Sequence, residues 1–168
     1  MTKPQHADHG LDDMPGNGPR LLLADHHRGI EKAYLAMLSA TYADDSRDLV
    51  REFRCFESAV LEHVAAEEEV ILPFYELFDA ADAALIRADH ARIREELTRA
   101  GIETDLHAMR VERMKGLVEA LRAHSAHEDS VMYPWAQVHL PLGARRTLFL
   151  RLTRSLQTLV DIAERAVS

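Results

Sequence analysis

The chain has 168 residues, a formal net charge of −8 and a single cysteine. This length suits one domain with a buried core, because chains of about 150 residues bury roughly 70% of the surface exposed on unfolding. The acidic balance argues against a nucleic-acid partner, since binding to phosphates needs a basic surface. Cys55 alone forms neither an intrachain disulfide nor a cysteine-rich metal site. With no signal-peptide pattern and no apolar stretch of about 18 residues, we expect a cytoplasmic protein without a membrane partner.

Residues 1–19 contain three prolines, three glycines and little apolar periodicity, which predicts a flexible leader before a domain of residues 20–168. After the leader, apolar residues recur every three or four positions, as is typical of helices that bury one face. Short polar or glycine-containing breaks divide this pattern. They predict five helices, at about residues 20–42, 46–76, 81–99, 105–136 and 144–166.

The short breaks also determine the expected fold. Helices joined by short connections pack as antiparallel neighbours, so the first four predict an all-α, up-down-up-down four-helix bundle. Ser46 and Asp79 are the expected N-caps of the second and third helices, and Gly101 is the expected stop of the third. The additional C-terminal helix, at about 144–166, has an apolar stripe that would pack on the bundle or form a homodimer: Leu148, Leu152, Leu156, Leu159, Val160 and Ala163.

Two polar residues, His63 and Glu67, interrupt the apolar stripe of the second helix. They occur in the segment HVAAEEEVILP, where three consecutive glutamates precede an apolar run. Glu68 and Glu69 lie about 100° and 200° around the helix from the stripe, so we expect them in solvent. The stripe itself, with its steps of three and four residues, consists of Phe53, Phe56, Val60, His63, Glu67, Val70 and Phe74.

The same arrangement occurs twice along the chain. The His-x-x-x-Glu pair that begins at His63 recurs 61 residues later at His124, and a proline follows each glutamate by six residues. The stripes of the first and third helices match at an offset of 63 residues, and each stripe contains one histidine. The chain therefore has the pattern of two helical hairpins related by a pseudo-twofold axis. The matching stripes are Met114, Leu117, Leu121, His124, Glu128, Val131 and Trp135 on the fourth helix, Leu23, His27, Ile30, Tyr34 and Met37 on the first, and Ile86, His90, Ile93, Leu97 and Ala100 on the third.

Burial of the polar members of these stripes would be costly without a partner. An ionised carboxylate in an apolar interior costs several kcal/mol, and an unpaired imidazole about 1 to 3 kcal/mol. Metal ions remove this penalty, because neutral imidazole and carboxylate are their ligands. Six donors from four helices suit two ions that carry two histidines each and are bridged by both glutamates. The predicted ligands are His27, His63, Glu67, His90, His124 and Glu128.

Around these ligands the sequence resembles the hemerythrin-like family, the HHE cation-binding domains. The matching segments are DHHRGIE, EHVAAEEEVILP, DHARIRE and AHSAHEDSVMYP, and the resemblance covers about residues 20–136. It implies a non-haem di-iron centre bridged by the two glutamates and usually by an oxo or hydroxo group. Zinc or manganese also suits these ligands. Oxygen-carrying relatives generally have five histidines, whereas only four lie at repeat-related positions here, which argues against reversible oxygen carriage.

Several other residues compete for a place at the site. His26 is the alternative to His27, although it lies about 100° off the stripe. His127 is one turn from His124, where it would add a fifth histidine ligand or a hydrogen bond to a ligand carboxylate. Tyr34 is expected in the core and is placed to line a small-ligand pocket. Surface positions are expected for Glu31, His6, His9, His107 and His139.

The expected function is a di-iron protein that binds or reacts with dioxygen, nitric oxide or hydrogen peroxide, in sensing or detoxification. One alternative is a non-catalytic interaction module in which metal occupancy controls folding and the surface of the fifth helix. Another is repair of iron-sulfur centres, although relatives with that role carry a cysteine-containing segment that this chain lacks.

Overall fold

The computed structural model describes residues 18–42 and 46–166, with side chains except at residues 21, 46 and 156–166. This part of the chain is helical and contains no strand. The predicted leader lies outside the described residues apart from its last two, and Pro19 begins the first helix. The elements are α1 (Pro19–Tyr42), α2 (Ser46–Ala66), the π-helical turn η1 (Glu67–Ile71), α3 (Leu72–Tyr75), α4 (Ala80–Asp105), α5 (Val111–Ser130), α6 (Met132–His139) and α7 (Leu142–Ala166).

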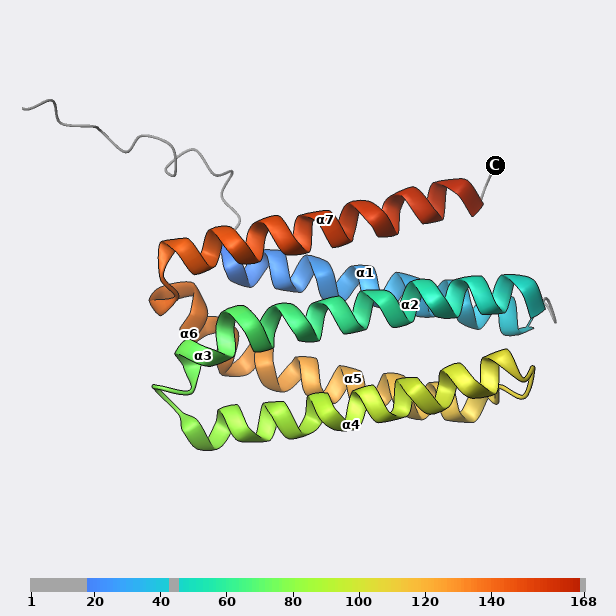
Figure 1. The fold of residues 1–168 in the computed structure, drawn as a ribbon, viewed down its shortest axis with the longest axis horizontal. Coiled ribbons are helices and arrows are strands. Elements are labelled where there is room, and N and C mark those ends of the chain that lie inside the picture. Colours follow the sequence, from blue (N-terminus) through green and yellow to red (C-terminus); the bar gives the residue numbers. More distant parts are fainter. Residues whose placement is uncertain (1–17, 43–45, 167–168) are drawn as a thin grey trace, which may run out of the picture.

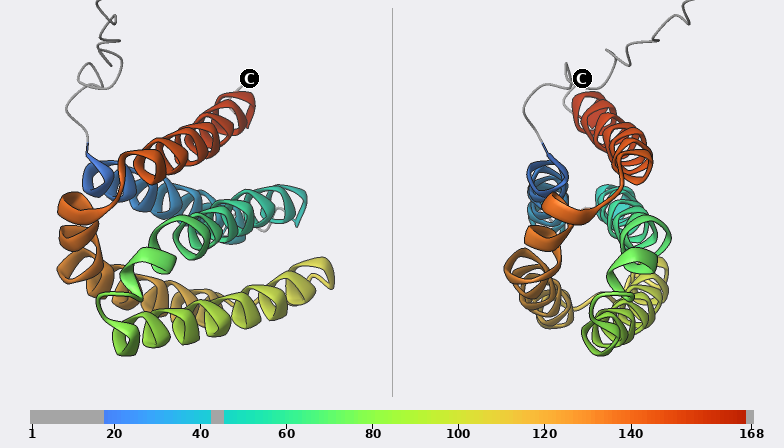
Figure 2. Two further views of the ribbon diagram at one scale, coloured as in Figure 1. Left: turned by 60° about the vertical axis from the view of Figure 1, so that its left-hand side comes forward. Right: turned by 90° about the vertical axis from the view of Figure 1, so that its left-hand side faces the viewer.

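Four long helices, α1, α2, α4 and α5, run up and down beside one another and confirm the predicted bundle (Figure 1). Each contacts two of the others, so that α1, α2, α4 and α5 close a ring in that order. The short segments α3 and α6 lie together at one end of the bundle, and α7 packs over α1 and α2 (Figure 2). Within the described residues, no helix has both the length and the apolar character needed to cross a bilayer.

The core of the bundle is divided into two apolar clusters. One cluster lies toward α3 and α6 and includes Leu23, Ile86 and Tyr133. The other fills the opposite half of the bundle and includes Met37 and Phe56. The buried histidines and glutamates occupy the layer between them along each helix, and both apolar clusters therefore limit the access of water to that layer.

Two boundaries of the third and fourth helices differ from the prediction. The expected stop at Gly101 is wrong, because α4 continues to Asp105 and Gly101 is buried inside it. A Cβ atom at Gly101 would lie 3.3 Å from the ring of Phe53, so the missing side chain permits close helix packing instead. The Asp79 cap is confirmed, since its carboxylate accepts a hydrogen bond from the Asp82 backbone. Ser46 is the first residue of α2, and the side chain that would show a cap lies outside the described ones.

In both hairpins the buried stripe shifts by one residue after the glutamate. In the first hairpin, the π-helical turn η1 inserts the extra residue ahead of Pro73, which cannot donate a backbone hydrogen bond. The expected core position of Phe74 is therefore wrong: its side chain is 38% exposed, and Tyr75 is buried in its place.

The second hairpin makes the same shift at a break between α5 and α6. Val131 forms this break and is 39% exposed, whereas Met132 and Tyr133 are fully buried. Trp135 only packs against the edge of the core. The predicted inward position of Val131 is consequently wrong, Trp135 packs on the core without entering its centre, and Met132 and Tyr133 are buried there instead.

The C-terminal helix α7 joins the same core as the bundle. Leu148 and Leu152, the first two members of its predicted stripe, are fully buried. Arg151 reinforces this packing through ion pairs with Glu62 at 2.9 Å and Glu69 at 2.5 Å. The rest of the stripe, Leu156, Leu159, Val160 and Ala163, lies outside the described side chains.

Candidate metal centre

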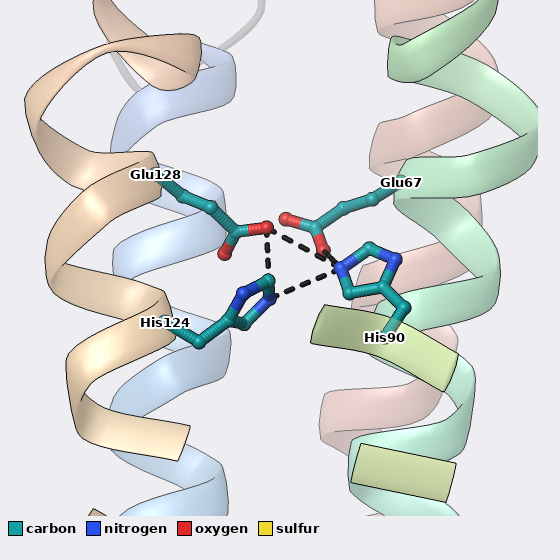
Figure 3. A group of neighbouring side chains, drawn as sticks. All are labelled: Glu67, His90, His124 and Glu128. Carbon is teal, nitrogen blue, oxygen red and sulfur yellow. Dashed lines mark hydrogen bonds and ion pairs between the residues drawn. The ribbon is translucent and has the colours of Figure 1, made fainter. Parts of the chain in front are cut away.

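The six predicted ligands, which come from four helices and the π-helical turn, meet in one layer of the bundle. His27 and His63, supplied by α1 and α2, form what we call the His27 side, and His90 and His124, supplied by α4 and α5, form the His90 side. The two glutamates, Glu67 on η1 and Glu128 on α5, are buried. Of the four predicted histidine ligands, His27 is partly exposed, at 15% of its side chain, and the other three are buried. Four of the six, Glu67, His90, His124 and Glu128, converge in Figure 3.

Each glutamate presents one oxygen to either side. Glu67 Oε1 lies 3.4 Å from His63 Nε2, and Glu67 Oε2 lies 3.4 Å from His90 Nε2. Glu128 Oε1 lies 3.0 Å from His124 Nε2, whereas its Oε2 lies 3.9 Å from the nearest imidazole nitrogen of His27. Carboxylates that divide their oxygens between two pairs of imidazoles have the arrangement needed to bridge two ions.

The spacing of the histidine nitrogens also fits metal binding. The Nε2 atoms of His27 and His63 are 2.8 Å apart, and those of His90 and His124 are 3.0 Å apart. Two imidazole nitrogens that bind one ion at right angles, each about 2.1 Å from it, would be about 3.0 Å apart. Both pairs are therefore close enough for their nitrogens to share one ion, and the same separations suit a hydrogen bond between the two rings.

Two groups of buried donors result, each able to hold a cation. One comprises Glu67, His90, His124 and Glu128, and the other comprises His27, His63 and Glu128. Glu67 Oε2 and Glu128 Oε1 are buried, accept no well-directed hydrogen bond within the described part of the chain, and face imidazole nitrogens of His90 and His124 at 3.4 and 3.0 Å. Such oxygens are costly to bury unless a cation neutralises them, so the donor set fits metal ions.

Without a metal ion, protons on the His90 side would neutralise the two acids. Burial alone lowers the pKa of His90, but contact with the carboxylates of Glu128 and Glu67 outweighs burial and raises it to about 10. The pKa of His124 is raised for the same reason. In contrast, burial holds the pKa of His63 well below its ordinary value. A metal ion on the His90 side must therefore displace protons.

Glu68 supports the His90 side and is not free in solvent, so its expected orientation is wrong. Its Oε1 lies 3.1 Å from His90 Nδ1, and Arg94 donates to both of its oxygens at 2.8 and 2.6 Å. Hydrogen bonds from Arg94 lower the pKa of Glu68 and keep it ionised. A carboxylate behind a ligand imidazole fixes the ring and its tautomer. Glu69, by contrast, is exposed as predicted.

Tyr133 is a residue of the candidate site that the stripe pattern missed. Its hydroxyl lies 3.2 Å from His63 Nε2 and 3.1 Å from Glu128 Oε2, and it also donates to Glu67. The sequence signal was the segment VMYP, whose tyrosine follows Glu128 by five residues. An unbroken helix would point this residue away from the stripe, and the break at Val131 turns it inward.

The competing histidines lie outside the donor groups. His26 is fully buried but faces α7, where its Nε2 lies 3.0 Å from Ser155 Oγ. Burial, together with the charge of His27, lowers the pKa of His26 to about 4. His127 lies 2.8 Å from Asp82 on α4, so neither of its two expected roles at the ligands holds. The expected exposure of His107 and His139 is confirmed, and His6 and His9 lie outside the described residues.

A cavity of about 300 Å³ reaches the His27 side between α1 and α5. His27, His63 and His124 form part of its wall, with apolar side chains such as Val60, and Tyr34 lines it as predicted. At its rim Arg122 forms an ion pair with Glu31. Glu31 is thus a surface charge, as expected. The cavity gives a small molecule a route to His27 and His63 on one side of the centre and to His124 on the other.

The fold and the two donor groups together define a helical-bundle protein with a cation-binding centre. The family model of the Hemerythrin HHE cation binding domain matches residues 19–136, which is more than half of the chain. The chain therefore belongs to this family, and α7 lies beyond the matched segment. No curated protein and no solved structure matches it.

Proposed function

We propose that this chain binds two iron ions and uses them to bind or reduce a small oxidant, namely dioxygen, nitric oxide or hydrogen peroxide, in sensing or detoxification. The observation that carries the proposal is the pair of buried donor groups with Glu128 in both. Iron supplies the redox chemistry that the side chains lack. The proposed ligands are His27, His63, Glu67, His90, His124 and Glu128.

The chain itself would position these ligands and control access to them. Glu68 holds the ring of His90, which favours a rigid His90 side. The apolar clusters above and below the layer keep water from the acids. The cavity beside His27 admits a small molecule, and the ion pair between Arg122 and Glu31 narrows its rim. We therefore assign ligand binding to the His27 side.

Metal analysis of the purified full chain tests this proposal, together with its near-ultraviolet and visible spectrum in air. Two irons per chain and consumption of hydrogen peroxide or nitric oxide are expected. The double variant His63→Ala, His124→Ala should lose both, whereas His107→Ala, which removes an exposed histidine, should lose neither. A colourless, metal-free chain that is fully folded would contradict the proposal.

A second candidate is an iron-responsive interaction module without turnover. His26 favours it, because its ring stacks on His63 with 5.0 Å between centroids while its Nε2 contacts Ser155 on α7. Movement of the proposed ligand His63 on metal binding would thus shift His26, and His26 would in turn change its contact with Ser155 on α7. Under this proposal, iron removal changes the oligomeric state or the protease sensitivity of α7, and Ser155→Ala weakens that response. A homodimer through α7 stays a prediction that sedimentation of the purified chain checks.

A further inference from the structure

The two donor groups are unequal, and Tyr133 lies where they differ. On the His90 side four residues bring donor atoms together, whereas three do so on the His27 side, where Glu67 Oε1 also lies 3.4 Å from His63 Nε2. The hydroxyl of Tyr133 lies 3.2 Å from the Nε2 atoms of both His27 and His63. It is therefore close enough to both histidines to add a further oxygen donor to the smaller group.

The contacts of Tyr133 exceed what a phenol satisfies by hydrogen bonding. Its hydroxyl faces Glu67 Oε1 and lies 3.1 Å from Glu128 Oε2. An ionised carboxylate only accepts hydrogen bonds, and a phenol has one proton to donate. One of the two oxygen contacts must therefore lack a hydrogen atom, and in a fully buried site this arrangement is unfavourable unless a cation attracts the oxygens.

From this convergence, we propose that Tyr133 is a metal ligand of the His27 side. The proposal rests on the proposed function, in that the donor groups must hold metal ions. If a ferric ion binds there, the phenolic O–H bond would break, its proton would pass to bulk water, and the electron pair left on the oxygen would form the bond to the metal. No electron is transferred in this step. Oxygen donors of this kind suit a highly charged cation such as ferric iron.

The internal repeat shows that this donor is specific to one side. The residue that corresponds to Tyr133 at the offset of 61 is Leu72, which is buried in the apolar cluster near α3. The two halves share the four histidines and two glutamates but not this oxygen. Tyr133 thus makes the two sides chemically different, because a phenol lies beside His27 and His63 and no equivalent oxygen lies beside His90 and His124.

The test is the visible spectrum of the iron-loaded full chain in air. A phenolate bound to ferric iron gives a charge-transfer band in the visible range, and Tyr133→Phe should abolish this band. The same variant should lower the affinity for one of the two iron ions about tenfold or more. Tyr75→Phe is the matched control, because Tyr75 is also fully buried but its hydroxyl contacts Asp82, 2.8 Å away. That variant should keep the band and both irons.

Resonance Raman spectra of the wild-type chain give a second readout that does not depend on folding of a variant. Phenolate vibrations that shift when the chain is made with ring-deuterated tyrosine are expected. If two irons bind but neither the band nor these vibrations occur, or if Tyr133→Phe retains them, the role of Tyr133 is overturned and the proposed function stands. A wild-type chain that takes up no metal overturns both.

Discussion

The His27 side and the His90 side contain the same ligand types, yet their surroundings differ. Behind His90, the carboxylate of Glu68 and the guanidinium of Arg94 form a fixed support. Beside His27 there is a cavity of about 300 Å³ and the hydroxyl of Tyr133. Two histidines and shared glutamates therefore lie beside a fixed support on the His90 side, and beside the cavity and a phenol on the His27 side. Under the proposed function, this difference would let the His90 side hold its ion and the His27 side meet a ligand.

The largest effect is expected from Glu128→Ala, since this residue belongs to both donor groups. Loss of its two oxygens removes a donor from each side at once, and metal content should fall from two ions to at most one. Glu119→Ala is the control, because Glu119 is exposed on the same helix. Metal analysis that still finds two ions in Glu128→Ala would rule out a shared carboxylate.

The pH dependence of metal binding should differ between the two sides, because the histidines on the His90 side are protonated in the metal-free fold. The pKa of His90 is raised to about 10 in the metal-free fold, whereas a histidine in the unfolded chain has a pKa of about 6.5. Protonation of His90 therefore stabilises the metal-free fold. This stabilisation is complete below about pH 6.5 and is lost as the pH rises through about 10. Metal affinity of the His90 side should rise over the same range, by up to about tenfold per pH unit for each displaced proton. Calorimetric titrations at several pH values check this; an affinity independent of pH would contradict it.

Removal of the support behind His90 should weaken only one ion. Glu68→Ala is expected to lower the affinity of the His90 side about 10- to 100-fold and to leave the His27 side unchanged. The control is Glu69→Ala, since the neighbouring Glu69 is exposed and pairs with Arg151. Competition with a chelator measures both affinities. Equal losses for the two variants would show that general surface charge, not the contact with His90, is responsible.

The smallest expected effect is on the rate at which a small ligand enters the cavity beside His27. Val60→Phe should narrow the cavity, because Val60 is buried in its wall, and should slow azide binding to the iron-loaded chain several-fold without changing metal content. Overpacking costs about 1 to 3 kcal/mol, so the melting temperature is measured as well. Leu61→Phe, at an exposed position of the same helix, is the control. Unchanged azide kinetics in Val60→Phe would mean that ligands reach the centre by another path.

The repeated stripes predicted the bundle and placed the four histidines and two glutamates in one layer, because helical spacing of three and four residues places side chains at a known angle. The same rule failed after each glutamate. It placed Phe74 and Trp135 inward, since it assumes an unbroken helix, and the structure has a π-helical turn in one hairpin and a break at Val131 in the other. A shift of one residue rotates a side chain by about 100°, which is enough to exchange Phe74 for Tyr75.

Sequence by itself determined the fold class, the antiparallel order of the helices and the histidines and glutamates of the buried layer, because these depend on periodicity and short connections within each helix. Only the tertiary structure decided what surrounds that layer. The support of His90 by Glu68, the contact of His26 with α7 and the position of Tyr133 each join residues of different helices. Such contacts depend on how helices rotate and pack against one another, and periodicity along one helix does not contain that information.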